Sequence, residues 1–274
     1  MKTNMIQSPC PSGLSKTQLK VFIIAKNEAC NIGKCLDSLG KLSLEVTLLL
    51  DHSSTDDTAL IASRYSFVDV VKYDFINHCL AYNQICTSLS DGAEFSMVLD
   101  ADMVVTEELF AEIAELATHP ETDVIKAPVL MYAEGQPLRY GSLYPPKAIV
   151  FKIGREYFVP VGHDGRLMDD FVISQTKTKL IHNDRKVYSD YLNSQYRYSQ
   201  LLITSAKNNS LTWRDRLRIN TPIMVFITPF VSYFIKLGFL SGKAALVYAL
   251  DRLIAEAVMF RQSLAEKLKE RSKK

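Results

Sequence analysis

The sequence predicts an α/β fold, with a parallel sheet in its N-terminal half and a helical region at its C-terminal end. Short apolar runs alternate with amphipathic stretches from Gln18 to about residue 120. The rhythm changes after Pro120, and a long apolar run begins at Ile223. Strands separated by helices of this length are typical of βαβ units, whose connections place successive strands in one parallel sheet.

Composition narrows the class of protein. The chain has 274 residues, 47% of them hydrophobic, which is enough to bury a large core without the help of disulfide bonds or bound metals. Its 32 Lys and Arg balance 30 Asp and Glu, so we expect no nucleic-acid partner, because phosphate binding usually needs a larger basic excess. Five cysteines without a Cys-x-x-Cys pair argue against a disulfide framework and a zinc ribbon. Residues 1–17 resemble a flexible leader without the apolar segment of a signal peptide, which predicts a cytoplasmic protein.

Four strands and four helices are predicted in the first 120 residues. Each strand is a short apolar run, and the helices are indicated by apolar residues three or four positions apart or by a capping residue. The strands are expected at 21–24, 46–50, 68–71 and 95–99. The helices are expected at about 32–39, around Leu60 after a cap at Ser54, at 80–89, and from Thr106 onward.

The rest of the chain predicts a second half and a helical tail. Strands at 124–131 and 147–153 flank a loop rich in glycine and proline, which favours a mixed or antiparallel extension of the sheet. Helical patterning resumes near Val187. We therefore divide the chain into a leader (1–17), an α/β domain (18–185, with halves 18–120 and 121–185) and a helical region (186–274).

The helical region contains an unusual apolar segment. Residues 223–240 are apolar except for Thr228, Ser232 and Lys236, and Pro229 interrupts them. A spanning helix needs about 20 apolar residues, so this run is slightly short. Basic residues lie on both sides of it: Arg214, Arg216, Arg218, Lys243 and Arg252. This pattern suits an element on an anionic membrane surface, and we expect membrane contact within residues 207–260. The alternative is a helical hairpin that packs on the α/β core.

Polar residues follow three of the predicted strands. Asp100-Ala101-Asp102 comes directly after the fourth strand, Asp51 ends the second, and Lys26-Asn27-Glu28 follows the first. Two carboxylates this close can share a hard divalent cation, which in turn can hold a diphosphate. Each motif alone could be a turn or a helix cap. Because parallel strands end at one edge of the sheet, their joint occurrence predicts a ligand site there.

These motifs resemble those of bacterial family 2 glycosyltransferases of the GT-A fold. The resemblance rests on Lys26-Asn27-Glu28, on Asp51 with Ser54-Thr55-Asp56, on Asn83 and on Asp100-Ala101-Asp102. Softer similarity to the lipopolysaccharide-core and cell-envelope branch lies in His163-Asp164, Ile181-His182, Asp184-Arg185-Lys186, Gln195-x-Arg197-Tyr198 and residues 238–242. The resemblance spans about residues 18–260. It implies a Rossmann-like nucleotide-sugar half, an acceptor half, a mixed central sheet and a C-terminal helical, membrane-associated segment.

The resemblance also implies individual roles. Lys26, Asn27, Glu28 and Asp51 would bind the nucleoside, with Asp51 at the base, and Asn83 would face the diphosphate. Asp100 would lie near the ribose and the metal, Asp102 would bind the metal directly, and His182 would complete the metal shell. Asp164 matches the acidic general base, with Asp169 and Asp170 close by in sequence. The chain departs from the family pattern at three places: His52-Ser53 replaces Asp-Gly or Ser-Gly, Met103 replaces a common Glu, and Asp164 replaces Glu.

The implied activity is sugar transfer by a hexosyltransferase-like enzyme, dependent on manganese or magnesium and inverting. The expected donor is a nucleotide-diphosphate sugar, specifically a UDP-sugar, and the expected acceptor is a cell-envelope glycan or a lipid-linked molecule. Peripheral contact with the cytoplasmic face of the inner membrane would fit such an acceptor. Two alternatives stay open: a non-catalytic protein that binds nucleotide sugar or glycan, and a nucleotidyltransferase. The latter typically has a glycine-rich loop where this chain has Ala25-Lys26-Asn27-Glu28.

Overall fold

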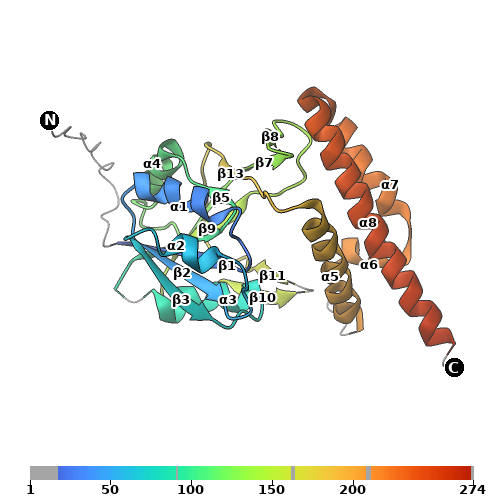
Figure 1. The fold of residues 1–274 in the computed structure, drawn as a ribbon, viewed down its shortest axis with the longest axis horizontal. Coiled ribbons are helices and arrows are strands. Elements are labelled where there is room, and N and C mark those ends of the chain that lie inside the picture. The colour runs from blue at the N-terminus through green and yellow to red at the C-terminus, as the bar shows by residue number, and fades with distance from the viewer. Residues whose placement is uncertain (1–17, 91, 162–163, 208–210, 273–274) are drawn as a thin grey trace.

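Figure 1 shows the computed structural model of the chain, which describes residues 18–90, 92–161, 164–207 and 211–272. The predicted leader lies outside the described residues. The described elements form an α/β body and a helical region that stands beside it (Figure 1).

A mixed sheet of seven strands forms the centre of the α/β body. Its strands are β1 Leu19–Ala25, β2 Val46–Asp51, β3 Val68–Tyr73, β4 Phe95–Asp100, β6 Val124–Ala127, β9 Lys147–Lys152 and β12 Ile173–Gln175. Their order is β12-β6-β9-β4-β1-β2-β3. Strands β4, β1, β2 and β3 are parallel, whereas β9 runs antiparallel to both β4 and β6. The predicted α/β class, with a parallel half and a mixed extension, is confirmed.

Helices cover both faces of the parallel part of the sheet because β1, β2 and β4 are apolar on both sides. On one face, Val21 and Ile23 of β1 pack with α1 (Ile32–Lys41), α2 (Thr58–Ala62) and α4 (Glu107–Leu116). On the other face, Phe22 packs with α3 (His78–Gln84) and the π-helical turn η1 (Ile85–Leu89). A strand buried on both faces reads as a continuous apolar run, which is why the sequence located these strands well.

The predicted strand at 124–131 is two strands that belong to different sheets. Pro128 separates β6 from β7 (Val129–Ala133), because proline has no N–H to donate to a strand partner. The remaining short strands are β5 Met103–Val104, β8 Gln136–Pro137, β10 Phe158–Val161, β11 Asp164–Leu167 and β13 Leu180–His182. Strands β5, β13, β7 and β8 form a second sheet in that order, and β10 and β11 pair as a hairpin.

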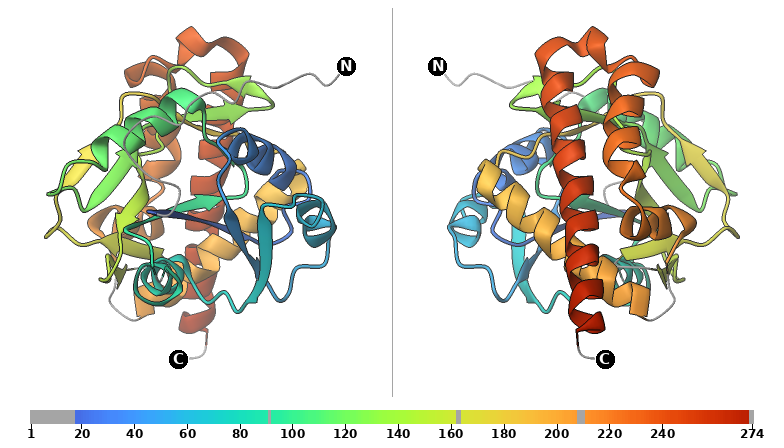
Figure 2. Two further views of the ribbon diagram at one scale, coloured as in Figure 1. Left: turned by 90° about the vertical axis from the view of Figure 1, so that its left-hand side faces the viewer. Right: turned by 90° about the vertical axis from the view of Figure 1, so that its right-hand side faces the viewer.

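The helical region is organised around one long helix. Its elements are α5 Tyr188–Lys207, α6 Trp213–Asn220, α7 Ile223–Phe230, η2 Val231–Ile235, η3 Gly238–Ser241 and α8 Gly242–Arg271. The helix α8 packs against α5, α6 and α7, and Figure 2 shows these shorter helices beside it. Among the described helices none is by itself long and apolar enough to cross a membrane. The pair of α6 and α7–η2 reaches that length and composition together, but its two parts meet at a 120° bend.

The helical region contacts the α/β body through a loop that ends at β9. Gly141 in this loop and Gly238 of η3 approach so closely that a Cβ added to Gly141 would lie 2.7 Å from the Gly238 Cα atom. Gly141 also has a φ of +91°, a conformation that side chains other than glycine rarely adopt. Two glycines are therefore needed for this contact.

Candidate active site

The three predicted motifs lie at one edge of the sheet. Strand β1 lies between β4 and β2, and Ile24 is opposite Asp100 while Ala25 is opposite Leu50. The residues that follow β1 are therefore next to Asp51 on one side and Asp100 on the other. The Lys26 ammonium is 3.7 Å from the Asp51 carboxylate. The convergence expected from parallel strand ends is present.

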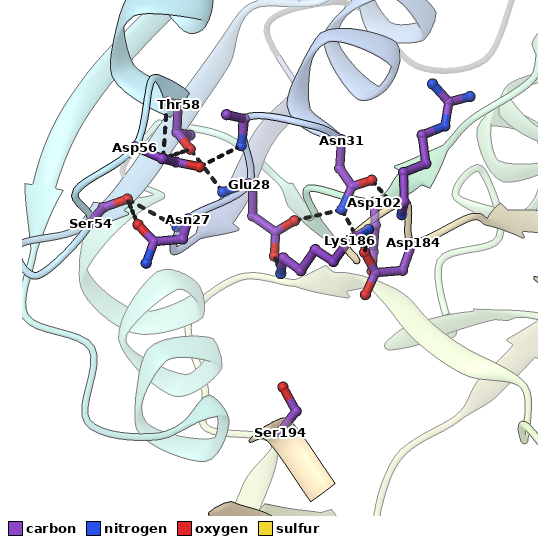
Figure 3. A network of polar contacts seen from close by, with 12 residues as sticks. Asn27, Glu28, Asn31, Ser54, Asp56, Thr58, Asp102, Asp184, Lys186 and Ser194 are labelled. Carbon is purple, nitrogen blue, oxygen red and sulfur yellow. Dashed lines mark hydrogen bonds and ion pairs between the residues drawn. The ribbon is translucent and has the colours of Figure 1, made fainter. Parts of the chain in front are cut away.

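The loop after β1 is held by side chains from the loop after β2 (Figure 3). Asn27 has a φ of +53°. Its backbone N–H donates to Ser54 Oγ at 3.0 Å, and its side-chain oxygen accepts from the backbone N–H of Thr55 at 2.8 Å. Asp56 accepts from the N–H of Ala29 at 2.9 Å. Ser54 was expected to cap the next helix, and this is wrong, because α2 begins at Thr58. The polar run after β2 shapes the neighbouring loop instead.

Asp51 is a buried carboxylate that stays charged. Only 7% of the residue is exposed, and the Ser53 backbone N–H donates to its Oδ1 at 2.8 Å. Burial works against the charged form, but hydrogen bonds from Ser53 and the nearby Lys26 ammonium outweigh it and hold the pKa of Asp51 below its usual value. A fixed anionic acceptor at this position can bind donor groups of a ligand.

Asp100 and Asp102 have opposite electrostatic surroundings. The Asp100 carboxylate forms an ion pair with Lys147, the first residue of β9, and this ammonium lowers its pKa despite burial. Burial, together with the charges of Asp100 and Asp184, raises the pKa of Asp102 to about 7. His182 Nε2 lies 3.2 Å from Asp102 Oδ2, because β13 pairs with β5 immediately after Asp102. Burial is the main cause that lowers the pKa of His182.

Several polar atoms here are buried without a hydrogen-bond partner among the described residues: Asp100 Oδ1, Asp102 Oδ1, His182 Nδ1 and Asn183 Oδ1. Buried polar groups are normally paired, so unpaired oxygens in a cluster indicate room for a ligand. Carboxylate oxygens are what Mg²⁺ and Mn²⁺ prefer, and Asp100 and Asp102 therefore fit a divalent cation, with His182 beside them. Within the described chain, no three His, Cys, Asp or Glu side chains form a preformed metal site.

A second network at this edge joins the loop after β13 to the loop after β1 (Figure 3). Lys186 forms an ion pair with Glu28, and Asn31 donates to both Glu28 Oε2 and Asp184 Oδ1 at 2.8 Å. The backbone N–H of Arg185 donates to Asn31 Oδ1 at 2.9 Å. The sequence resemblance covered Asp184-Arg185-Lys186 but assigned it no role. The structure shows that it closes the rim of the site, directly before α5.

Glu28 makes a pH-dependent contribution to stability. Burial raises its pKa from 4.5 to about 7, outweighing Lys186. Between these two values the folded chain keeps a proton that the unfolded chain releases, so stability falls as pH rises. We expect the free energy of unfolding to fall by about 2–3 kcal/mol more in the wild type than in Glu28→Gln between pH 5 and 8. Thermal unfolding across this range measures it. Glu45→Gln at an exposed position is the control, and parallel curves for wild type and Glu28→Gln would contradict the prediction.

The two other predicted residues lie on α3 and β11. Asn83 is buried in α3; its side chain accepts from the backbone N–H groups of Tyr157 and Phe158 at 2.9 Å and donates to Phe158 O at 2.8 Å. These bonds attach β10 to α3. Asp164 opens β11, which pairs with β10, but its side chain and the preceding His163 lie outside the described part of the structure. The role predicted for each stays a prediction.

Comparisons with known proteins agree with the fold and the motifs. The glycosyl transferase family 2 model matches residues 20–163, more than half of the chain. An uncharacterized glycosyltransferase of Rickettsia prowazekii is 28% identical over 108 residues, which is 39% of this chain and only 35% of that protein.

Solved structures resemble the chain more distantly. TarS residues 1–349 from S. aureus, in complex with UDP-GlcNAc, is 14% identical with a TM-score of 0.46 and covers 89% of this chain and 92% of its own. Glucosyl-3-phosphoglycerate synthase from Mycobacterium tuberculosis is 18% identical with a TM-score of 0.46, and the match covers 74% of this chain and 85% of that one. On the strength of the family match, the chain belongs to glycosyl transferase family 2.

Proposed function

We propose that the chain transfers a sugar from a nucleotide-diphosphate sugar, specifically a UDP-sugar, with inversion at the anomeric carbon. The observation that carries this proposal is the convergence of Asp51, Asp100 and Asp102 at the ends of β2 and β4, the two strands that flank β1. Lys26 and Asp51 give the nucleoside a fixed donor and acceptor, 3.7 Å apart. The acidic pair at β4 lies on the other side of β1, where a diphosphate would extend.

The leaving group explains the charges at the β4 end. Negative charge develops on the diphosphate as the glycosidic bond breaks, and groups that stabilise it in the transition state accelerate the reaction. A divalent cation, Mn²⁺ or Mg²⁺, held by Asp102 with Asp100 and His182 would supply part of this stabilisation. The chain itself provides two ammonium groups at this edge, Lys147 and Lys186, each held by a carboxylate.

Asp164 is proposed as the general base. It would take the proton of the acceptor hydroxyl while that oxygen attacks the anomeric carbon from the side opposite the leaving diphosphate. Attack from that side inverts the configuration. The support is the position of Asp164 in the sequence motif and at the start of β11, in the half of the domain that follows the donor motifs.

A cell-envelope glycan or a lipid-linked molecule is the proposed acceptor. The support is the helical region that follows the rim of the site at Lys186, because its α6–η3 segment exposes large apolar side chains. Such a surface suits an enzyme whose acceptor lies at or near a membrane.

Donor binding is the direct test. We expect UDP and UDP-sugars with Mn²⁺ to raise the melting temperature of the full chain, because ligands that bind only the folded state stabilise it by mass action. At 100 times Kd the gain is about 2.7 kcal/mol, or about 5–10 °C for a chain of this size.

Asp51→Asn should reduce this shift without lowering the melting temperature of the free chain by a similar amount. Nucleoside diphosphates with other bases, each with and without Mn²⁺, determine the base preference. Absence of stabilisation by every nucleotide would contradict the proposal. Stabilisation by a nucleoside triphosphate with release of pyrophosphate would favour nucleotidyl transfer instead.

A further inference from the structure

We infer that the outer surface of α6, α7, η2 and η3 binds an anionic phospholipid bilayer. This surface, called the docking surface below, is formed by Trp213, Phe226, Phe230, Phe234, Ile235 and Leu240, each more than half exposed. The inference goes beyond sugar transfer and does not depend on it, because lipid binding is measured on the chain alone.

The polarity of α7 and η2 is the reverse of that of a helix on the surface of a water-soluble protein. The polar residues face inward: Thr228 is 8% exposed and donates to Glu256, and Ser232 is fully buried and donates to Gly141 O. The phenylalanines face outward at positions 226, 230 and 234, which are four residues apart and therefore lie on one side. A surface helix in water normally shows the opposite arrangement. An apolar exterior is stable where the surroundings are lipid.

The charged side chains beside the docking surface are mostly basic. Residues 211–250 contain a single acidic residue, Asp215, which is buried and bonded to Thr212 and Arg218. Arg214 and Arg216 on α6 are exposed, and the Arg214 guanidinium lies 5.2 Å from the centre of the Trp213 ring. Tryptophan and arginine together are typical of the level of lipid headgroups.

Two cavities open between the docking surface and the α/β body, and their charged side chains are also basic. One, of about 390 Å³, is lined by Arg139, Leu240 and Lys243 among others, and the other, of about 320 Å³, by Arg139, Lys179 and Lys236. None of these four cations forms an ion pair with a described acidic side chain. Unpaired cations at the edge of an apolar surface fit the phosphate groups of anionic lipids.

The same cations disfavour the other occupant of an apolar face, a second copy of the chain. In a symmetric dimer the same patch meets itself, so the basic edges of two copies would approach each other. Like charges brought together across an interface cost several kcal/mol, whereas an anionic bilayer complements them. The bilayer is therefore the occupant that the charges support.

Docking would also bring the site to the membrane. The loop that leads to Lys147 is bonded to the docking region at three points: Gly141 N–H to Lys236 O at 2.9 Å, Ser232 to Gly141 O at 2.7 Å, and Tyr140 N–H to Ser241 Oγ at 2.8 Å. Farther along the same loop, the Tyr144 ring lies 5.5 Å from the His182 ring. A bilayer on the docking surface would thus be one loop away from Asp102.

Co-sedimentation of the full chain with vesicles tests the inference. We expect binding to vesicles of phosphatidylcholine with 30% phosphatidylglycerol, and at least about tenfold weaker binding to phosphatidylcholine alone. Arg139→Gln with Lys243→Gln should weaken binding to the anionic vesicles by about 25-fold, roughly fivefold for each charge. Lys41→Gln with Lys72→Gln, at exposed positions on the α/β body, is the matched control and should change it little.

The apolar component has its own pair of variants. Phe230→Glu with Phe234→Glu should reduce binding at least about tenfold, because both side chains are 54% exposed and would enter the bilayer. Leu264→Glu with Leu268→Glu adds the same charge at positions 46% and 57% exposed near the end of α8, and should bind as the wild type does. Equal loss in both pairs, with folding confirmed by circular dichroism, would overturn the inference.

The chain carries its own reporter, since Trp213 is its single tryptophan and is 67% exposed. On addition of anionic vesicles its emission should shift to shorter wavelength and be quenched by brominated acyl chains. Vesicle binding without this shift would show that another surface binds and would overturn the inference. So would a lack of vesicle binding together with a dimer in solution that Phe230→Glu and Phe234→Glu dissociate.

Discussion

Asp102→Asn should abolish sugar transfer and leave the fold intact. The Asp102 carboxylate has one oxygen near His182 and one buried without a partner, and asparagine keeps the shape but not the charge. The loss should be at least about 10³-fold, equivalent to about 4 kcal/mol of transition-state stabilisation. The measurement is release of nucleoside diphosphate from a panel of UDP-sugars in Mn²⁺, which needs no knowledge of the acceptor.

Stability separates this loss from misfolding. Burial and the neighbouring charges of Asp100 and Asp184 disfavour a charged Asp102, so the melting temperature of Asp102→Asn should equal or exceed that of the wild type at pH 8. Asp69→Asn, on an exposed part of β3, should retain activity. If Asp102→Asn keeps substantial activity, or the wild type keeps it in excess chelator, the proposed metal role is wrong.

The sequence predicted the parallel half of the fold well because its signals are local. Strands β1, β2 and β4 are apolar on both faces, and α4 begins directly after Thr106, where the sequence predicted a helix to start. The Thr106 Oγ1 accepts from Leu109 N–H at 3.2 Å and caps this helix. Strands β5, β8 and β10 to β13 were missed because they have only two to four residues each. Strands this short are defined by the partners they meet, and sequence periodicity cannot detect them.

The same difference between local and distant signals applies to the site. The acidic groups could be placed because each follows a strand, and parallel strands end at the same edge. The positions of the cations could not be predicted, because their partners are distant in sequence. Lys147 pairs with Asp100, 47 residues away along the chain, and Lys186 pairs with Glu28, 158 residues away. Neither lysine has a local pattern that distinguishes it from an exposed one. The inward direction of Thr228 and Ser232 was equally hidden, because it depends on where α8 and the Gly141 loop lie.

Lys147→Met should cause a large loss of stability. The ion pair with Asp100 is largely withdrawn from solvent, with side-chain exposures of 15% for the lysine and 25% for the aspartate. Removing the ammonium leaves Asp100 charged beside Asp102, and breaking one side of a buried pair typically costs 3–5 kcal/mol. For a chain of this size we expect the melting temperature to fall by about 10 °C. Lys72→Met at an exposed position should cost little.

Two further measurements identify the cause of that loss. Asp100→Asn combined with Lys147→Met should recover most of the stability, because no uncompensated charge is then buried. Mn²⁺ alone should raise the melting temperature of Lys147→Met more than that of the wild type, since the variant leaves both Asp100 oxygens free for a cation. A double variant as unstable as Lys147→Met would show that the lysine stabilises the fold through packing. An equal Mn²⁺ response in wild type and variant would show that Asp100 does not contribute to cation binding.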